Sequence, residues 1–346
     1  MGYYDGLFDA LGLREWCGGG ASDGPMTMAQ LLAKSRGGGE VVASGPWWQV
    51  PFPSLDTLNA SCSAIWRTRD LTAWVADGFL DIKNTLKFIL DPLTQPLSWM
   101  LDGALWAMLA VPWWVVVAVI LAVVGLLTRS VTLTLSVGLS LLFLGFIDHF
   151  NYAMQTLSII FVCTAICVVL GVPIGIAMSK WNTFQRSMVP LLDMLQTLPT
   201  FVYLIPLIFL FSVTESKLYG IAIILYAIVP VIRLTDLGIR LVDKDVLEAA
   251  DAFGMAPRQR LFGVEIPLAL PTIMAGINQT IMMALAMVVI ASLVSAPGLG
   301  VLVLRGIRNL ELGVGLIAGF CIVILAVILD RVSKAALGRI NVARPG

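Results

Sequence analysis

From about residue 109 onward, the chain alternates between long apolar segments and short polar connections. A helix needs roughly 20 apolar residues to cross the hydrocarbon core of a bilayer, and seven segments reach or approach that length. They lie at Leu109–Leu127, Val131–Ile147, Thr156–Met178, Pro190–Phe211, Leu218–Ile232, Thr272–Val294 and Gly313–Leu329. A backbone in lipid must satisfy its own hydrogen bonds, so each segment is expected to be a helix. The pattern therefore predicts an all-α membrane protein with about seven spanning helices, of which the second and fifth are short.

A different pattern occupies residues 70–108, where charges interrupt an apolar stripe at helical spacing. The stripe consists of Leu71, Trp74, Val75, Phe79, Ile82, Leu86 and Ile89. Such a segment is typical of a helix that lies along the bilayer surface rather than crossing it. Pro92 and Pro96 are expected to divide it into two amphipathic interfacial helices.

The residues before this segment, 1–69, are predicted to form a flexible tail. Runs of three glycines at two places, together with Pro46, Pro51 and Pro53, argue against a packed core there. The first residues lack a basic start followed by a long apolar run, so no cleavable signal peptide is expected. Cys17 and Cys62 both lie in this tail. In an oxidising compartment the two could pair, but sequence alone does not show that they are close.

The most informative polar connection runs over residues 243–267. Apolar and small residues recur there at three- and four-residue steps, which predicts a short amphipathic helix; they are Val246, Leu247, Ala250, Phe253 and Gly254. Gly254 is placed to end that helix in a conformation that other residues resist. Pro257 suits the first turn of a second helix, and Pro267 is expected to stop it. The connection is thus predicted to be a rigid helix–turn–helix exposed to water.

Charge gives the orientation of the predicted spans. If the 243–267 connection is cytoplasmic, the same side carries Arg129, Lys180, Arg186, Arg233, Arg240, Lys244, Arg258, Arg260, Arg331, Lys334, Arg339 and Arg344. The opposite connections carry only Lys217, Arg305 and Arg308. Basic residues are enriched in cytoplasmic loops. The amino terminus is therefore predicted outside, and residues 335–346 form a cytoplasmic tail.

Composition narrows the chemistry. Of the 346 residues, 58% are hydrophobic and 13% are charged, which is typical of a membrane protein. The net charge of zero gives no reason to expect a nucleic-acid partner. The five cysteines show no paired metal spacing, and the single histidine, His149, is expected in an interfacial loop. For these reasons no metal site and no catalytic residue are expected on this chain. No phosphate-binding glycine loop ending in Lys-Ser or Lys-Thr is present, so no ATP site is expected either.

Residues 243–267 also resemble a known signature. Type I ABC importers carry a cytoplasmic loop with Glu-Ala-Ala, three residues, Gly, nine residues and Ile-x-Leu-Pro. Glu248-Ala249-Ala250, Gly254 and Val264-Glu265-Ile266-Pro267 match this spacing, with Val264 and Ile266 as conservative departures. The resemblance implies a coupling helix that docks on an ATP-hydrolysing subunit. The residues expected to couple are Glu248, Ala249, Ala250, Gly254, Met255, Ala256 and Pro257.

Further stretches resemble the permease subunits of glycine betaine and proline betaine importers. They are Pro190 to Pro206, Pro271 to Thr280, Met287 to Ser292, Pro297 to Gly300 and Leu304 to Ile307. The resemblance implies the type I ABC importer transmembrane domain as the fold, with a core at 151–334 and two peripheral helices at 109–150. It also implies a second copy of the permease, two ATP-binding subunits that hold ATP and Mg, and an external solute-binding protein. The expected location is the cytoplasmic (inner) membrane.

Polar residues in or beside the predicted spans have two interpretations. Hydrogen bonds between helices are the ordinary one, and a polar route for a small solute is the other; the residues are Gln196, Thr197, Asn278, Gln279 and Thr280. Pro199 and Pro206 should bend or interrupt the fourth segment, and broken helices often border transport routes. Phe201, Tyr203 and Tyr226 could offer aromatic faces to a betaine headgroup, although aromatic residues at helical spacing also serve as core.

Two other functional classes compete with an ATP-driven permease. A secondary transporter or channel would work without an ATPase, but several predicted spans lack interior carboxylates or lysines. A membrane scaffold is compatible with the exposed connection but gives no role to the proline-broken helix. The sequence does not choose among glycine betaine, proline betaine, choline, carnitine and trimethylamine N-oxide, which are all small and share a crowded nitrogen.

Overall fold

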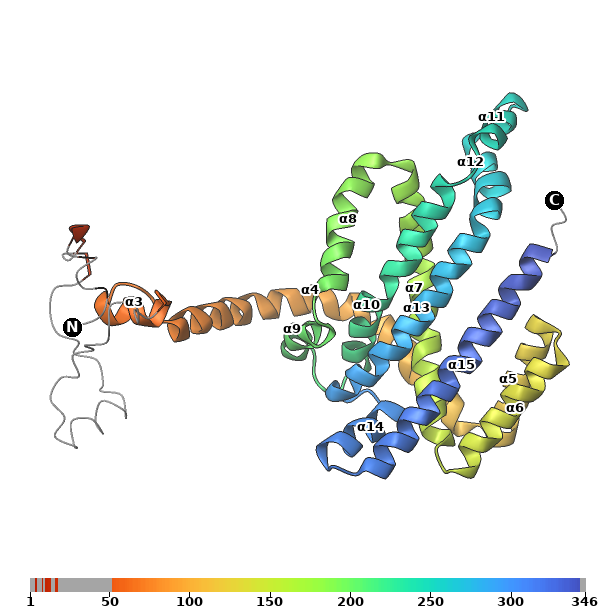
Figure 1. Ribbon diagram of the computed structural model, residues 1–346, viewed down its shortest axis with the longest axis horizontal. Coiled ribbons are helices and arrows are strands. Elements are labelled where there is room, and N and C mark those ends of the chain that lie inside the picture. Colours follow the sequence, from red (N-terminus) through yellow and green to blue (C-terminus); the bar gives the residue numbers. More distant parts are fainter. Residues whose placement is uncertain (1–3, 5–7, 9, 14–15, 18–51, 343–346) are drawn as a thin grey trace. The chain divides into compact units, whose positions relative to one another are not determined.

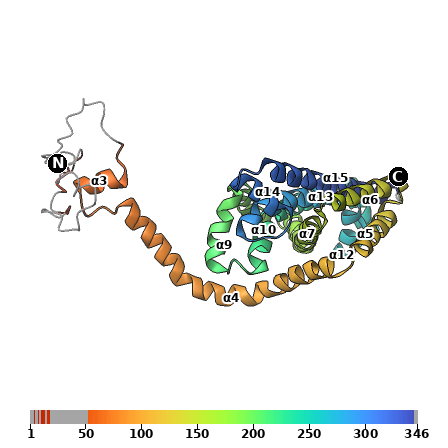
Figure 2. The same ribbon diagram turned by 90° about the horizontal axis from the view of Figure 1, so that it is seen from below.

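The computed structural model describes residues 4, 8, 10–13, 16–17 and 52–342, and the described residues form helices and turns without strands. The chain divides into two compact units, Met1–Leu86 and Lys87–Gly346. Both are drawn in Figure 1 and, turned by 90°, in Figure 2. The prediction of an all-α protein is confirmed.

The first unit contains a small core closed by a disulfide. Cys17 and Cys62 are bonded to each other, with 4.7 Å between their Cα atoms. Both are buried, and Phe8 and Leu58 pack with them. Helix α3 (Leu55–Ser61) leads into Cys62. The pairing left open by the sequence is therefore present. The tail was expected to have no packed core, and this is wrong around Cys17 and Cys62, where the disulfide joins two short apolar segments. Residues 18–51 lie outside the described residues.

Helix α4 (Thr68–Ala110) corrects the predicted division at Pro92 and Pro96, since both prolines lie inside one continuous helix. Each proline removes one backbone donor, and the two sit four residues apart, on one face. Tertiary contacts in the second unit compensate. Leu97 and Leu101 pack so closely on α10 (Ser216–Arg240) that a Cβ on Gly220 would lie 3.2 and 2.6 Å from them.

The second unit continues with α5 (Trp113–Thr128), α6 (Val131–Phe146) and α7 (Phe150–Lys180). Arg129 has φ of 47° and ends α5, and the Ser130 side chain caps α6 by accepting from the Leu133 N–H at 3.4 Å. The facing apolar residues of α5, α6 and α15 (Leu312–Val342) form one buried cluster with the start of α7. These helices therefore pack as a layer beside the centre of the unit.

The predicted span Pro190–Phe211 is broken. Its residues fall in α8 (Asn182–Thr197), η2 (Thr200–Tyr203) and α9 (Leu204–Leu210), with a bend of 105°. Pro199 interrupts the helix as predicted, because the residue before a proline avoids the helical region, and Leu198 is extended. Pro206 does not interrupt it, contrary to prediction. It is the third residue of α9 and so lies in the first turn of that helix, where proline is tolerated.

Helices α7, α10 and α13 (Ile266–Ala291) form the centre of the second unit. Small residues on α7 let the helices approach closely. A Cβ on Gly171 would lie 2.4 Å from Val231 Cγ1, and one on Gly175 would lie 2.6 Å from the Ile232 carbonyl oxygen. After α13 the chain passes through η4 (Ser292–Val294) to α14 (Leu299–Arg308), which packs on α15.

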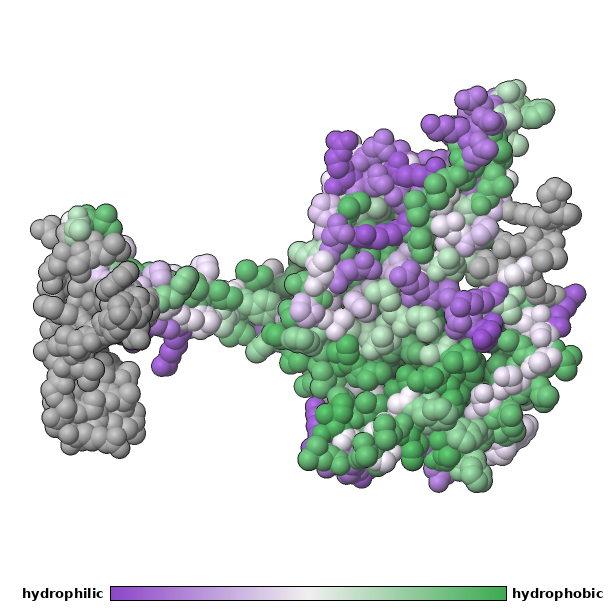
Figure 3. All heavy atoms as spheres, viewed as in Figure 1, coloured by the Kyte–Doolittle hydropathy of each residue, from purple (hydrophilic) through white to green (hydrophobic). Residues whose placement is uncertain are grey.

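Four helical segments among the described residues are long and apolar enough to cross a membrane: Phe150–Lys180, Ser216–Arg240, Pro257–Val294 and Leu312–Ala336. The number rises to six if the bent pairs α4–α5 and α8–α9 each count as one span, and α6 is shorter. The count of seven thus stays a prediction. Figure 3 shows hydrophobic residues over much of the visible face of the second unit, and hydrophilic residues gathered around α8 and α11.

Candidate functional site

Residues 243–267, called the loop below, form the predicted helix–turn–helix. Helix α11 (Lys244–Ala252) starts at Asp243, whose side chain accepts from the Asp245 N–H at 3.0 Å. Gly254 follows with φ of +75°. Helix α12 (Pro257–Arg260) begins at Pro257, and the Gln259 side chain accepts from the Ala256 N–H at 3.0 Å. Local sequence therefore determines both helix starts and the turn.

The prediction that Pro267 stops the second helix is wrong. Helix α12 continues through one π-helical turn, η3 (Leu261–Glu265), into α13 without an end. The Ile266 N–H donates to the Leu261 carbonyl, five residues back. Pro267 follows as one of the first residues of α13, so its missing N–H coincides with the change of hydrogen-bond spacing.

The predicted coupling residues are mostly at the surface. Glu248, Ala249, Gly254, Met255, Ala256 and Pro257 are exposed, whereas Ala250 is buried. Large apolar side chains accompany them: Phe253 is 86% exposed and Phe262 is 68% exposed. Apolar side chains at such exposure, next to a carboxylate, are typical of a surface that a partner covers.

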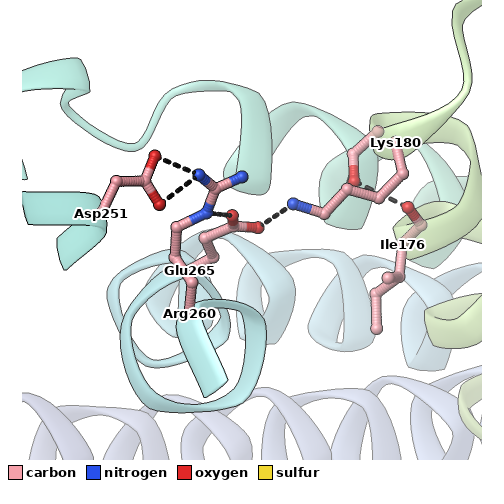
Figure 4. A network of polar contacts seen from close by, with 6 residues as sticks. Ile176, Lys180, Asp251, Arg260 and Glu265 are labelled. Carbon is pink, nitrogen blue, oxygen red and sulfur yellow. Dashed lines mark hydrogen bonds and ion pairs between the residues drawn. The ribbon is translucent and has the colours of Figure 1, made fainter. Parts of the chain in front are cut away.

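A network of charged residues joins the two helices of the loop to each other and to α7 (Figure 4). The Asp251 carboxylate accepts from Arg260 Nη1 at 2.6 and 2.7 Å, and Arg260 Nε donates to Glu265 Oε1 at 3.1 Å. Glu265 Oε2 accepts from Lys180, at the end of α7. Two anions and two cations thus balance.

Glu265 is the residue of the candidate site that sequence reasoning missed. It was only a variable position of the signature, yet its side chain is 2% exposed and contacts two cations. A carboxylate between apolar residues at the edge of a predicted span was the available signal, because a buried charge needs a partner. Lys180, the partner, entered the sequence reasoning only as a charge for orientation.

The first group of predicted path residues lies around the break between α8 and α9. Gln196 and Thr197 are exposed at the end of α8. Phe201 in η2 is 57% exposed, while Tyr203 is buried and donates to the Leu195 carbonyl. The hydrogen bond of the Tyr203 hydroxyl therefore connects the two sides of the break. Of these two aromatic side chains, Phe201 is the one exposed enough to contact a solute.

The second group lies on α13 and faces a different neighbour. The Asn278 amide donates to Asp330 Oδ1 at 3.2 Å and accepts from Ser333, both on α15. Thr280 is buried, and its hydroxyl has no hydrogen-bond partner. Gln279 is exposed. Asn278 thus bonds helices to each other, as the ordinary interpretation expects. The two groups are not gathered into one site, although η2 and α13 are in contact.

Neither the cavities nor the arrangement of possible metal ligands indicates a competing site. One cavity of about 480 Å³ lies between α5, α6 and the start of α7, with Trp113, Phe146 and Asp148 among its lining residues. Within residues 52–342 and the few described before them, no cluster of His, Cys, Asp or Glu could hold a metal ion. The loop is therefore the strongest candidate functional site.

Comparison with known proteins gives the family. Residues 168–341 match the family described as binding-protein-dependent transport system inner membrane component. The chain belongs to this family. The match contains the loop, the break at Pro199 and both groups of predicted path residues. The chain is thus a multi-pass inner-membrane component of a transport system, and the reading as a permease is preferred to a scaffold or an independent carrier.

Curated relatives carry transport names. Over 286 residues the chain is 39% identical to the glycine betaine/proline betaine transport system permease protein ProW of Escherichia coli (strain K12), covering 82% of this chain and 80% of the relative. It is 40% identical over 264 residues to the glycine betaine transport system permease protein OpuAB of Bacillus subtilis (strain 168), covering 75% and 92%. It is 37% identical over 222 residues to the trimethylamine N-oxide transport system permease protein TmoV of Ruegeria pomeroyi, covering 64% of this chain and 34% of the relative.

Among solved structures, the chain resembles the one described as inward facing conformations of the MetNI methionine ABC transporter. The TM-score is 0.50 at 18% identity, over 56% of this chain and 95% of the other. At this identity the likeness concerns the fold alone. The predicted fold, the type I ABC importer transmembrane domain, is confirmed.

Proposed function

We propose that the chain is the permease subunit of an ATP-driven importer for a small quaternary amine or a related compatible solute. The observation that carries the proposal is the exposed loop. It has a rigid turn at Gly254, and its exposed side chains Glu248, Phe253 and Met255 form a surface on which a partner subunit could dock. The names of the relatives support the solute class: glycine betaine, proline betaine and trimethylamine N-oxide are all compact and share a crowded nitrogen.

The partners follow from the same proposal. A second copy of this chain completes the membrane pathway, and two ATP-binding subunits bind ATP and Mg and dock on the loop of each copy. An external solute-binding protein delivers the solute. ATP hydrolysis then takes place on the partner subunits, and this chain couples it to alternating access.

The proposed orientation places the first unit outside the cytoplasmic membrane and the loop inside. Three features support it. The disulfide between Cys17 and Cys62 fits an oxidising compartment. Basic residues gather on the side of the loop. The carboxyl-terminal part of α15 lies toward the same end of the second unit as α11 (Figure 1).

For the solute route, we propose the surface around the α8–α9 break. Gln196 and Thr197 offer polar groups, and Phe201 offers an exposed aromatic face. A quaternary nitrogen is attracted to such a face. Thr280, a buried hydroxyl without a partner, is the residue of α13 best suited to meet a polar solute.

The test is reconstitution of the chain with an ATPase subunit and a solute-binding protein from the same organism. We expect the ATPase to co-purify with the permease, and glycine betaine, proline betaine, choline, carnitine or trimethylamine N-oxide to stimulate ATP hydrolysis and enter proteoliposomes. Uptake of solute without ATP and without a bound ATPase would contradict the proposal in favour of a secondary transporter.

A further inference from the structure

The network of charged residues at the loop joins elements that are far apart in sequence. Lys180 is the last residue of α7, and Glu265, which ends η3, follows 85 residues later. The two oxygens of Glu265 contact different cations, Lys180 and Arg260. A carboxylate that is 2% exposed stays an anion only where cations and hydrogen bonds replace water. An ion pair with a buried carboxylate therefore fixes the end of α7 to the loop.

The residues beside Lys180 form the turn between α7 and α8. Arg240, at the end of α10, donates to the Met178 carbonyl at 2.6 Å and to the Asn182 side chain at 3.0 Å. Asn182 is the first residue of α8. The α7–α8 turn is thus held by α10 on one side and by the loop on the other, and α8 starts at that point. Figure 4 shows Lys180 reaching from α7 toward Glu265.

We propose that Lys180 and Glu265 are positioning residues that carry a displacement of the loop to the α7–α8 turn and along α8. The proposal rests on the proposed function, because an ATPase subunit has to move the loop. Helix α8 is 16 residues long and ends at Thr197, beside the break at Pro199, so a shift at its start reaches the proposed solute route.

An ion pair suits this task better than the other attachment of the loop. That attachment is apolar: Leu247 packs in a cluster with residues of α7, α10 and α13. Apolar contacts are not directional and allow sliding. A buried carboxylate between two cations has a defined geometry and resists it, since sliding would leave a buried charge without its partner.

Lys180→Gln tests the link with little disturbance elsewhere, because Glu265 keeps its contact with Arg260. The complex with its ATPase subunit and binding protein is reconstituted, and solute uptake per ATP hydrolysed is measured beside ATPase co-purification. We expect normal assembly and retained basal hydrolysis, with uptake per ATP lowered about tenfold. Lys180→Arg, which keeps the charge, should restore most of it. Arg186→Gln is the matched control: it removes an exposed cation from the same end of α8.

Each outcome decides between coupling and structure. Uptake per ATP within the range of Arg186→Gln would overturn the proposal. Loss of Lys180→Gln from the membrane, with Lys180→Arg present in normal amounts, would also overturn it by showing a purely structural role. Failure of the unaltered complex to couple ATP hydrolysis to uptake would instead contradict the proposed function, on which this inference depends.

Discussion

At residue 254 the requirement for glycine comes from the backbone and not from crowding. Its φ is +75°, and a Cβ built there would meet nothing within 4 Å. The left-handed turn closes the end of α11, with the Gly254 N–H donating to the Asp251 carbonyl at 2.9 Å and the Met255 N–H to the Ala250 carbonyl at 3.2 Å. A side chain at this position would therefore disturb the turn only through its own conformational preference.

Gly254→Val is expected to cost roughly 1–2 kcal/mol at the turn, because branched residues resist positive φ. The two helices of the loop should lose their fixed angle, while the membrane segments are untouched. Solute uptake by the complex, at equal amounts in the membrane, should fall sharply. Gly254→Asn should keep most of the uptake, since asparagine enters this region more readily. Full uptake by Gly254→Val would contradict the coupling role.

Gly254 could be predicted from the sequence because its role is local. A glycine at the end of an amphipathic stripe is enough to indicate a helix end. For Glu265 the carboxylate between apolar residues was visible in the sequence but its partner was not, since Lys180 stands 85 positions earlier. The same limit applies to Asn278: its polar side chain was noticed, but its partners on α15 are 52 and 55 residues away.

At the scale of elements, proline has different consequences at different places. Pro199 breaks a helix, whereas Pro92 and Pro96 lie within α4 and Pro206 lies in the first turn of α9. The sequence predicted all four as interruptions. Pro206 is tolerated because of its position in the first turn, and Pro92 and Pro96 are tolerated because α4 packs against α10. This packing cannot be seen in a local sequence pattern.

The contact between α14 and α15 depends on a glycine pair. A Cβ on Gly306 would lie 2.5 Å from Gly315 Cα and 2.6 Å from its nitrogen, so Gly306→Ala must push the helices apart. We expect a loss of about 1–3 kcal/mol, seen as a lower midpoint in thermal unfolding of the purified protein. Gly313→Ala is the control, because nothing lies within 4 Å there. Equal midpoints for the two variants would show that the helices do not pack this closely.

At the scale of the whole molecule, composition indicated the class of protein: the high hydrophobic fraction indicated a membrane protein. The orientation inferred from the charge asymmetry stays a prediction. The small core of the first unit was not predictable, because it depends on bringing Cys17 next to Cys62 across 45 residues.

The orientation can be measured with reporters. A reporter fused after Phe52 is expected outside the membrane and one fused after Arg344 inside, since the basic residues favour the side of the loop. Reporters on the same side would mean that the number of spans is even.

The disulfide offers an independent check. In protein isolated from membranes without reductant, alkylation and mass spectrometry should find Cys17 and Cys62 blocked until reduction, because an outside location is oxidising. Two freely alkylated thiols before reduction would place the first unit in a reducing compartment.

The π-helical turn η3 determines where the loop points. Relative to an α-helix, a π-turn contains one extra residue, and each residue of an α-helix turns the chain by about 100°. Deleting one residue from Leu261–Glu265 would therefore rotate α11 and α12 about the axis of α13 by roughly that angle, with their own sequences unchanged. The direction in which the exposed side chains of α11 and α12 face is thus set by η3, as an offset of one residue before α13.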